Sequence, residues 1–486
     1  MDTTQNDTST PETQAQVERL GTASVPRLVL EFAIPSIIGM VVNGLYNIID
    51  AIFMGHGVGA AGLATATVAG PAMIFSMAIG MLIGAGGNAL VALKLGEGKH
   101  DEAERVLGNA FTLTLIAAAA CTILINIFMD PVLEFSGATA DIWSYSHDFM
   151  RIISVGFILQ FFGMGFNNFM RTAGAPGLAL GTMVAGTIVC IILNYLFVMV
   201  LGLGIAGSAW ATVIGQGLSA ALVFWYFVFY KKAPFRIRLS CMGLRPGLVR
   251  TILALGSASF VLQIANTVIN LIINNQLVIY GTLDVIGSEG ALAAIGVVQR
   301  IAMFALFPIF GVAIAAQPLF GFNFGAQNFR RVQTVFKVSF IWVTAIGIFF
   351  WLLVHLFPNQ IIGVFGVRSD LLNFTVAALQ VQMFFMPLVG LQIIAVNYFQ
   401  SSGQPLKSMF LTLTRQLLYL IPLVWGLPLL AQTFPELLGI TPLQTLYHCF
   451  PIADCLSVVT AGLMTIIEFR KLNIRIREHN QSVAAI

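Results

Sequence analysis

The stretch NFMRTAGAP, residues 168–176, returns 229 positions later as NYFQSSGQP, residues 397–405. The asparagine, the glycine and the final proline keep their places in both copies. Other residues recur at the same offset: Gly96 and Gly325, Gly137 and Gly366, Asp141 and Asp370. Matches at one offset over so much of the chain indicate two related halves, an organisation typical of membrane transporters.

Both halves are strongly apolar. Charged residues are 9% of the 486 residues, whereas about 25% is usual in a soluble domain. The hydrophobic fraction is 58% and the mean hydropathy is +0.89, so the bilayer must be the solvent of this chain. The five cysteines are odd in number and contain no CxxC pair, so we expect neither a disulfide nor a metal site.

Twelve segments are long and apolar enough to span a bilayer, which takes about 20 residues. The first half, residues 25–230, contains the segments 28–54, 62–92, 107–129, 146–170, 177–201 and 206–230. The second half, residues 250–470, contains 250–280, 291–320, 333–357, 374–399, 406–430 and 443–469. We therefore expect an all-α membrane protein with twelve transmembrane helices in two six-helix lobes related by internal duplication.

Three polar segments flank the lobes. Residues 1–24 are rich in Thr, Gln and Ser, and we expect a disordered cytoplasmic tail. Residues 231–249 carry five basic residues and no acidic one, which favours a basic cytoplasmic linker near anionic headgroups. Residues 471–486 are expected to form a cytoplasmic C-terminal tail.

Basic residues gather on one side of the predicted spans. Of the 24 lysines and arginines, 20 lie in the tails, in the linker or in loops on the same side. Arg151, Arg300 and Arg415 lie within predicted spans, and Arg368 lies in an opposite loop. The positive-inside rule therefore places both termini in the cytoplasm.

Asp50 is the strongest candidate for chemistry, because ionisable groups within spans are costly and usually functional. Asn43, Tyr46 and Asn47 precede it at spacings that place all four side chains on one face of a helix. We expect this stripe to line a substrate cavity, with Asp50 coupling transport to an ion. The alternative is an aspartate at the outer headgroups. Pro35, in the same span, removes one backbone hydrogen bond and could act as a hinge.

A second polar stripe lies in the span 250–280, on one helical face: Gln263, Asn266, Asn270 and Asn274. Asn266 and Asn270 correspond to Asn43 and Asn47 at an offset of 223, but no carboxylate corresponds to Asp50. We expect the stripe to line the same cavity, with interhelical hydrogen bonding as the alternative.

Asp454 lies in the middle of the last predicted span, with no basic residue near it in sequence. It is a candidate for the cavity lining. Pairing with Arg415 or Arg300 is the structural alternative.

ATP-driven transport has no support in the sequence. LGEGKH, residues 95–100, lacks the first glycine of a phosphate-binding loop, and His100 follows Lys99 where Ser or Thr is required. The energy must therefore come from an ion gradient or from the gradient of the substrate.

Several motifs resemble those of the multidrug and toxic compound extrusion (MATE) family, in its bacterial drug-efflux branch. They are the Pro35-to-Asp50 pattern, GNALVALKLGEGKHDEA (87–103), RTAGAP (171–176), GIAGSAWATVIGQ (204–216) and QPLFGFNFGAQNFRRV (317–332). The resemblance covers residues 25 to 470. It implies two lobes in a V shape and export of bulky, often cationic drugs in exchange for H⁺ or Na⁺.

The resemblance also implies an ion site that combines the first-helix aspartate, an Asn-x-x-x-Asp pair in the fifth helix and a threonine in the sixth. Asp50 and Thr212 fit this pattern. In the fifth helix Cys190 and Asn194 stand at the paired positions, so one carboxylate and one amide oxygen are missing. We therefore expect Asp50 to bind a proton, with Asn194 and Thr212 hydrogen-bonded to it. Gln263 stands where the family often has glutamate.

These observations predict a secondary active multidrug exporter of a bacterial inner membrane, not an enzyme. It would exchange H⁺, in preference to Na⁺, for amphipathic and often cationic organic compounds by alternating access. We expect a monomer with no cofactor and no nucleic-acid partner. The main alternative is a flippase for lipid-linked or amphiphilic cargo, although only three arginines lie within spans to bind anionic headgroups. A channel or membrane scaffold is a further alternative.

Overall fold

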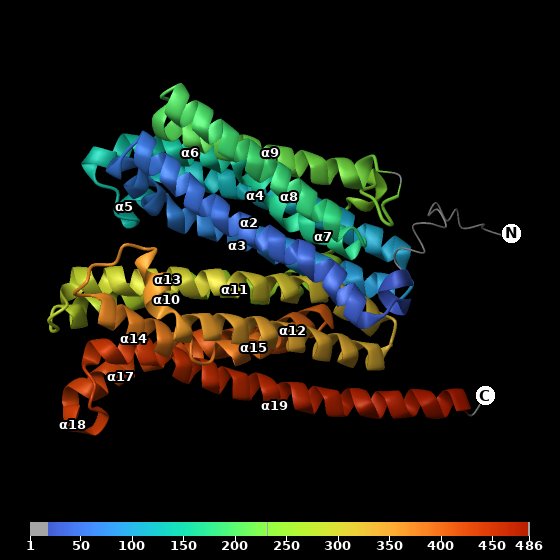
Figure 1. Ribbon diagram of the computed structural model, residues 1–486. Helices are drawn as coiled ribbons and strands as arrows, with labels where there is room; N and C mark the ends of the chain where they lie inside the picture. Colours follow the sequence, from blue (N-terminus) through green and yellow to red (C-terminus); the bar gives the residue numbers. More distant parts are fainter. Residues whose placement is uncertain (1–17, 231, 485–486) are drawn as a thin grey trace.

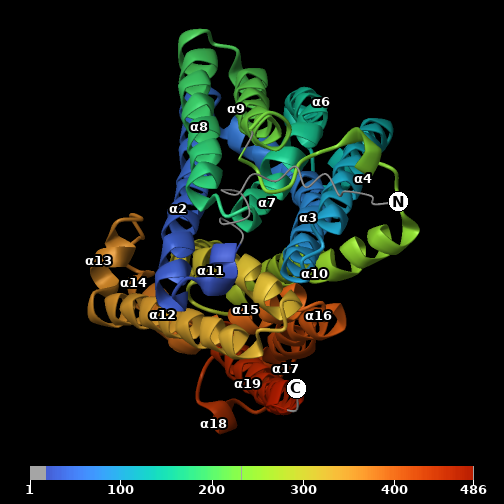
Figure 2. The ribbon, with the colours of Figure 1, turned by 90° about the vertical axis from the view of Figure 1, so that its right-hand side faces the viewer.

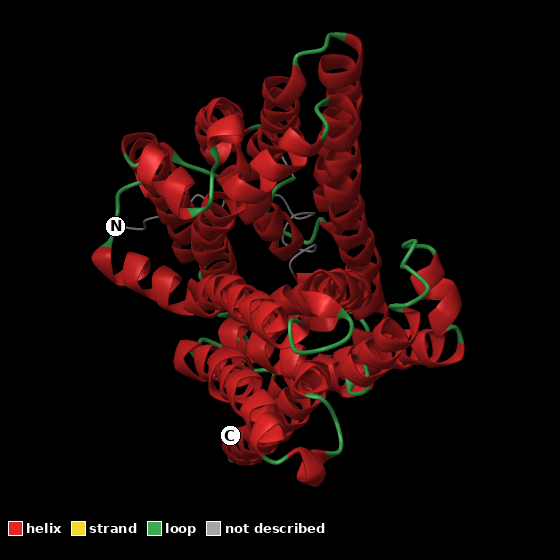
Figure 3. Cartoon of the chain, turned by 90° about the vertical axis from the view of Figure 1, so that its left-hand side faces the viewer, coloured by secondary structure: helices red, strands yellow, loops and turns green. Residues whose placement is uncertain are grey.

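The computed structural model describes residues 18–230 and 232–484, and every regular element in this part of the chain is a helix (Figure 3). The first lobe contains α2 Val25–Gly57, α3 Ala60–Gly96, α4 His100–Ile127, α5 Met129–Phe135, α6 Trp143–Gln160, α7 Phe166–Thr172, α8 Pro176–Asn194 and α9 Gly204–Val228. Two π-helical segments, η2 Phe161–Gly165 and η3 Tyr195–Val200, continue α6 and α8.

The second lobe has the corresponding helices. They are α10 Pro246–Gly281, α11 Gly287–Gly325, α12 Phe329–Leu356, α13 Pro358–Gly363, α14 Leu372–Gln382, α15 Met386–Ser401, α16 Pro405–Leu413, α17 Ile421–Thr433, α18 Pro435–Leu438 and α19 Pro442–Ala484. The π-helical segment η5, Thr414–Leu420, joins α16 to α17.

The predicted number of spans is confirmed. Within the described residues, eleven helical segments are long and apolar enough to cross a membrane, and α14 with α15 forms a twelfth span bent by 47°. Pro387 lies in the first turn of α15, where it lacks an N–H and disfavours helical geometry at the preceding residue. The predicted span 374–399 is therefore two helical pieces.

The two lobes meet at one end of the molecule and diverge toward the other (Figure 1). Both described chain ends lie toward the end of the molecule at which the lobes meet, and we call this end the terminal end (Figure 1). Viewed from there, α2 reaches onto α11 and α12 of the second lobe, while α10 reaches onto α3 and α4 of the first (Figure 2). The first helix of each lobe thus packs against the opposite lobe.

Glycines allow the lobes to approach closely. Gly86 of α3 lies against the backbone of α10, and a methyl group there would collide with the carbonyl of Ile252. Gly256 of α10 faces the backbone of Leu82 in the same way. Small residues at helix contacts permit such backbone approach inside a membrane. This seam fixes the first helix of each lobe against the opposite lobe.

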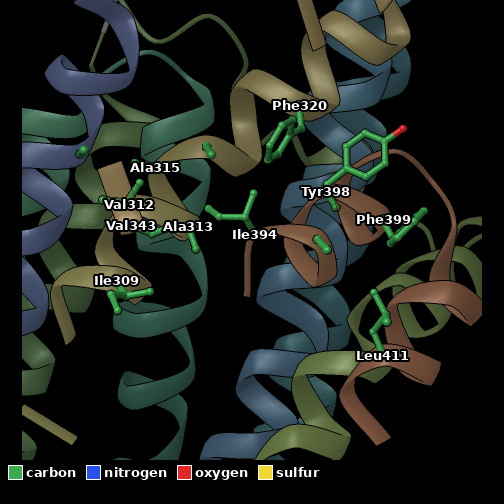
Figure 4. Packing of buried hydrophobic residues seen from close by; sticks show 14 of the residues in the cluster. Ile309, Val312, Ala313, Ala315, Phe320, Val343, Ile394, Tyr398, Phe399 and Leu411 are labelled. Carbon is green, nitrogen blue, oxygen red and sulfur yellow. The ribbon is translucent and has the colours of Figure 1, made fainter. Parts of the chain in front are cut away.

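The core of the second lobe forms around α11, α12 and α15 (Figure 4). Ile309, Phe320, Val343, Ile394 and Tyr398 are at most 1% exposed. The rings of Phe320 and Tyr398 meet edge to face at 5.5 Å between centroids. The interior of this lobe is thus filled by side chains.

Residues 18–24 correct one expectation about the N-terminal tail. Residues 1–17 lie outside the described part of the chain, but residues 18–22 are helical and Leu20 is only 1% exposed. Asn323 of α11 donates a hydrogen bond to the Leu20 carbonyl at 3.0 Å. The order of this segment comes from contact with the second lobe, which local composition cannot reveal.

Two of the predicted segment boundaries differ from the helix ends in the structure. The linker ends where α10 begins at Pro246, not at residue 249, because proline is well suited to the first turn of a helix. The last helix, α19, continues through the predicted boundary at residue 470 as far as Ala484. The described part of the C-terminal tail is thus an extension of this helix.

Candidate functional site

Asp50 lies in a polar cluster between α2, α8 and α9, near the end of the first lobe remote from the termini. Asn194, the last residue of α8, donates a hydrogen bond from Nδ2 to Asp50 Oδ1 at 2.9 Å. Ser208 of α9 donates from Oγ to the same oxygen at 3.2 Å. Asp50 is half-buried and Asn194 is 1% exposed, so the carboxylate faces the interior of the first lobe. The predicted Asp50–Asn194 contact is present.

Thr212 is not hydrogen-bonded to Asp50, contrary to the prediction. Its hydroxyl lies 2.9 Å from the hydroxyl of Tyr46, one helical turn before Asp50. The Cys190 thiol lies 3.5 Å from the same Tyr46 oxygen and 3.9 Å from Thr212 Oγ1. Tyr46 and Asp50 lie four residues apart on one face of α2, so each meets a different turn of α9.

Ser208 is the site residue that the sequence analysis missed. It precedes Thr212 by four residues, so both side chains lie on the same face of α9. That spacing was the available signal, because Tyr46 and Asp50 have the same separation on α2. Two parallel pairs therefore link the helices: Asp50 with Ser208, and Tyr46 with Thr212.

The chemistry of the cluster depends on a single carboxylate. Within the described residues, no lysine or arginine pairs with Asp50, and its hydrogen bonds come from Asn194 and Ser208. The Oδ1 atom of Asn194 is buried without a hydrogen-bond partner there. No group of three His, Cys, Asp or Glu residues gathers to hold a metal ion in this part of the chain. A carboxyl group so placed can exchange one proton.

Asn194 lies at the C-terminal end of the regular α-helix α8. The chain widens into the π-helical segment η3 immediately after it. The fifth span of the second lobe also contains a π-helical segment, η5, which lies nearer to the start of its span than η3 does and carries Arg415 and Gln416. Single π-helical turns inside α-helices often occur at functional sites.

The remaining members of the first stripe lie beside the cluster. Asn47 is exposed, and its Nδ2 donates to the backbone carbonyl of Asn43 at 2.8 Å. Asn43 is half-buried. Gly44, adjacent to Asn43, faces Phe307 of α11 in the second lobe. The stripe therefore runs along α2 between the interior of its own lobe and the opposite lobe.

The second stripe is divided between two environments. Gln416 donates from Nε2 to Asn266 Oδ1 at 2.8 Å, so Asn266 takes part in interhelical hydrogen bonding although it is exposed like Asn270 and Asn274. Asn270 and Asn274 are exposed, and Gln263 is half-buried. The structure brings together Asn266 and Gln416, while Asn270 and Asn274 remain accessible on α10.

Asp454 forms an ion pair with Arg415 at 2.7 Å between Oδ1 and Nε. The Asp454 side chain is 6% exposed and that of Arg415 is 24% exposed. The structure thus selects the pairing alternative, with Arg415 and not Arg300 as the partner. The carboxylate of Asp454 is neutralised inside the second lobe and does not line a cavity.

Pro35 lies inside α2, which remains one helix from Val25 to Gly57. Proline removes the hydrogen bond that the N–H of this position would donate to Glu31 four residues earlier. The next turn contains Gly39, which packs against the Met183 side chain of α8. The weakened turn therefore lies between the part of α2 at the terminal end and the part that carries Asp50.

The duplication is visible in a comparison with known families. The MatE family model matches residues 35–196 and again residues 258–425. The starts of the two matches, 35 and 258, differ by 223, and their ends, 196 and 425, differ by 229. These are the two offsets that relate the polar stripes and the NFMRTAGAP repeat.

This chain belongs to the MatE family. Among its relatives, the multidrug export protein MepA of Staphylococcus saprophyticus is 23% identical over 386 residues, covering 79% of this chain and 83% of MepA. The probable multidrug resistance protein YoeA of Bacillus subtilis is 24% identical over 379 residues, covering 76% of this chain and 79% of YoeA. Members of the family are transporters, so this chain is a multi-pass membrane transporter and not an enzyme.

Solved MATE structures share the fold. An outward-facing multidrug resistance MATE family transporter is 22% identical, with a TM-score of 0.86 over 96% of this chain and 99% of that one. A MATE structure described as straight matches with a TM-score of 0.86 at 21% identity, and one described as bent with 0.84 at 22%. Both cover 96% of this chain and 99% of the solved chain.

Proposed function

We propose that this protein is a secondary active exporter that exchanges protons for amphipathic, often cationic organic compounds, with Asp50 as the coupling residue. The hydrogen-bonded cluster around Asp50 carries this proposal, because it contains one carboxylate held by two neutral donors. The names of the relatives MepA and YoeA refer to multidrug export and multidrug resistance, and they support organic compounds as the substrate class.

A proton fits the cluster better than a sodium ion. Hard cations are bound by several oxygen ligands, of which carboxylates contribute most of the charge. Here Asn194 directs its Nδ2 group at Asp50, and the Cys190 position supplies sulfur in place of an amide oxygen. A proton needs only the carboxylate, since Asn194 and Ser208 can hydrogen-bond to either charge state.

We place the substrate path between the lobes and assign the accessible residues of both polar stripes to its lining. Asn47 of α2 and Asn270 and Asn274 of α10 provide hydrogen-bonding groups along helices that are otherwise apolar. Such a lining binds amphipathic molecules through apolar contact with a few polar anchors. The charge distribution of the loops supports cytoplasmic termini, so the terminal end would face the cytoplasm.

In this cycle α2 bends at Pro35 when Asp50 changes its protonation state. Solved MATE structures described as straight and as bent support two conformations for a protein of this fold. The bend would move the stripe on α2 relative to α8 and release the substrate on the side opposite the termini. Cysteines placed along α2 should then change their accessibility with pH.

The decisive experiment is ethidium efflux from drug-sensitive bacteria that express wild type or Asp50→Asn. The proton gradient and the sodium gradient are collapsed separately. We expect export by the wild type, none by Asp50→Asn, and loss of export only when the proton gradient is removed. Dependence on sodium alone would overturn proton coupling.

A flippase for lipid-linked or amphiphilic cargo is the second candidate function. It would need cationic groups along the path, but Arg415 is engaged with Asp454 inside the second lobe. If the well-expressed wild type exports no drug and instead moves a labelled anionic lipid between leaflets, the flippase replaces the drug exporter.

A further inference from the structure

The segment before α2 is bound by the opposite lobe. We call residues 18–24 the N-terminal strap. Arg331 of α12 donates hydrogen bonds to the carbonyls of Leu20 and Ala23, and Asn323 of α11 donates to the Leu20 carbonyl. Leu20 is buried, and Gly21 lies against the ring of Phe322. The first lobe therefore begins with a segment that the second lobe holds.

The segment before α10 is bound by the first lobe. We call residues 233–245 the linker strap. Asn109 of α4 donates from Nδ2 to the Cys241 carbonyl at 3.3 Å and accepts from the Arg245 N–H at 2.8 Å. Thr112 donates to the Met242 carbonyl at 2.8 Å. The start of α10 is thus fixed to the opposite lobe.

Charge and apolar packing add to these backbone contacts. Arg238 forms an ion pair with Glu104 of α4 at 3.0 Å, and the Glu104 side chain is 9% exposed. Phe235 is fully buried and stacks on Phe227 with centroids 5.7 Å apart. The buried ring of Phe235 and the buried carboxylate of Glu104 therefore bind the linker strap to the first lobe, beyond the covalent connection of the chain.

Both straps end in the same way. Ser24 and Arg245 have extended ψ angles of 128° and 116°, and each is followed within two residues by a proline in the first turn of the helix, Pro26 or Pro246. Each strap is therefore a separate unit joined to the first helix of its lobe by a non-helical residue. The arrangement is reciprocal, since each lobe holds the start of the first helix of the other.

We propose that the two straps form a paired latch that holds the terminal end closed. This inference rests on the alternating-access cycle proposed above. The lobes cannot separate at this end while Arg331 holds the N-terminal strap and Asn109 and Thr112 hold the linker strap. Release of the straps is thus a step in opening, and weakening either one favours the state open at the terminal end.

The test uses a thiol placed in the seam between the lobes. Leu93 of α3 is suitable, because its carbonyl lies against Gly325 and its side chain lies near Gly403, both in the second lobe. The Leu93→Cys protein in lipid nanodiscs is treated with a charged maleimide, and mass spectrometry follows labelling at position 93. Native thiols, such as that of Cys241, are assigned separately.

Two independent variants weaken the latch. In Gly108→Ala the new methyl group would collide with the Cys241 carbonyl, so the linker strap must shift. Gly243→Ala in the same strap is the matched control, because nothing lies within 4 Å of its added methyl group. Arg331→Gln weakens the N-terminal strap, and Arg330→Gln changes the adjacent exposed arginine.

We expect labelling at position 93 to rise about fivefold in Gly108→Ala and in Arg331→Gln, which corresponds to about 1 kcal/mol. The two controls should label like the parent. Unchanged labelling in both weakened variants, with normal expression and a monodisperse product, overturns the latch. The labelling experiment does not require transport. If the protein exports no drug but shows increased labelling at position 93 in both weakened variants, the result contradicts the proposed function and still supports the latch.

Discussion

At the scale of single residues, Asn194 and Cys190 carry the argument for proton binding by the Asp50 cluster. Both lie on the fifth span, four residues apart, and Asn194 Nδ2 lies 3.8 Å from Cys190 Sγ. The resemblance to the MATE family implied an aspartate and an asparagine at these two positions. Their replacement leaves one carboxylate and removes oxygen ligands, which is the residue-level argument for the proposed proton coupling.

Asn194→Asp should introduce sodium dependence. The new carboxylate would lie at about hydrogen-bond distance from Asp50, and two ionised carboxylates so close repel unless a cation or a proton lies between them. We expect ethidium efflux by this variant to be stimulated by an inward sodium gradient, as measured in vesicles with the pH clamped. Asn47→Asp, on the exposed side of α2, is the control; sodium stimulation of both variants or of neither would contradict the assignment.

Arg171 has a different environment from its counterpart in the repeat. It is 6% exposed, donates to Asn168 Oδ1 at 2.5 Å and has no carboxylate partner within the described residues; its Nε atom is unsatisfied there. The corresponding residue of the second lobe is Gln400, whose amide donates to the Leu255 carbonyl and to Ser259. A neutral amide therefore fits this place in the fold.

Arg171→Gln should stabilise the protein by about 1–3 kcal/mol, because it removes a buried charge that lacks a counter-charge. Thermal unfolding in detergent, followed by tryptophan fluorescence, measures this change. The exposed Arg330→Gln should alter stability by less than about 0.5 kcal/mol. A lower melting temperature for Arg171→Gln than for the control would show that its guanidinium is adequately solvated.

At the scale of helices, α2 combines three features: a first turn that follows the bound N-terminal strap, a turn weakened by Pro35, and the candidate ion site at Asp50. Its first residues follow the N-terminal strap, Pro35 lies ten residues after Val25, and Asp50 lies near its far end. One helix can therefore transmit a change at Asp50 to the seam at the terminal end. The paired spacing of Tyr46 and Asp50 against Thr212 and Ser208 keeps α2 in register with α9.

Pro35→Ala should slow export while leaving substrate binding intact. Alanine restores the missing backbone hydrogen bond and stiffens the turn, since proline inside a helix costs about 3 kcal/mol relative to alanine. We expect efflux to fall at least about tenfold, a change of about 1.4 kcal/mol in the barrier. Fluorescence titration with ethidium should give an unchanged Kd; efflux at the wild-type rate would exclude a hinge at this proline.

At the scale of the whole molecule, the close seam between lobes depends on glycine. Gly256 of α10 lies against the Leu82 backbone, and Gly86 of α3 lies against Ile252 and Gly256 itself. The lobes share no covalent link there except the chain between α9 and α10. The proposed alternating access thus requires that the two lobes pack tightly along this seam in one state and separate along it in another.

Gly256→Ala should destabilise the closed seam, because its methyl group would collide with a backbone carbonyl and not with a side chain that can move. Overpacking of this kind costs about 1–3 kcal/mol. We expect a lower melting temperature and reduced efflux. Gly247→Ala, near the start of the same helix with nothing within 4 Å of the added methyl group, should match wild type; equal melting temperatures for the two variants would contradict the tight seam.

The sequence alone determined the features that depend on composition and periodicity. The twelve spans follow from apolar length, and the duplication follows from residues that recur at fixed offsets. The family was predicted from motifs that resemble those of the MATE family. All of these signals are local or repeated along the chain. Asp50 was also predictable, because an ionisable group within a span is costly and usually functional. Its contact with Asn194 was predicted from the resemblance to the MATE family.

Only the tertiary structure decided which polar groups meet between helices. It replaced the expected Thr212–Asp50 bond with Tyr46–Thr212, added Ser208, and paired Asp454 with Arg415. It also ordered residues 18–24 on the opposite lobe. These contacts depend on the rotation and depth of one helix relative to another, which are set by packing between the helices and leave no mark on the spacing within either one.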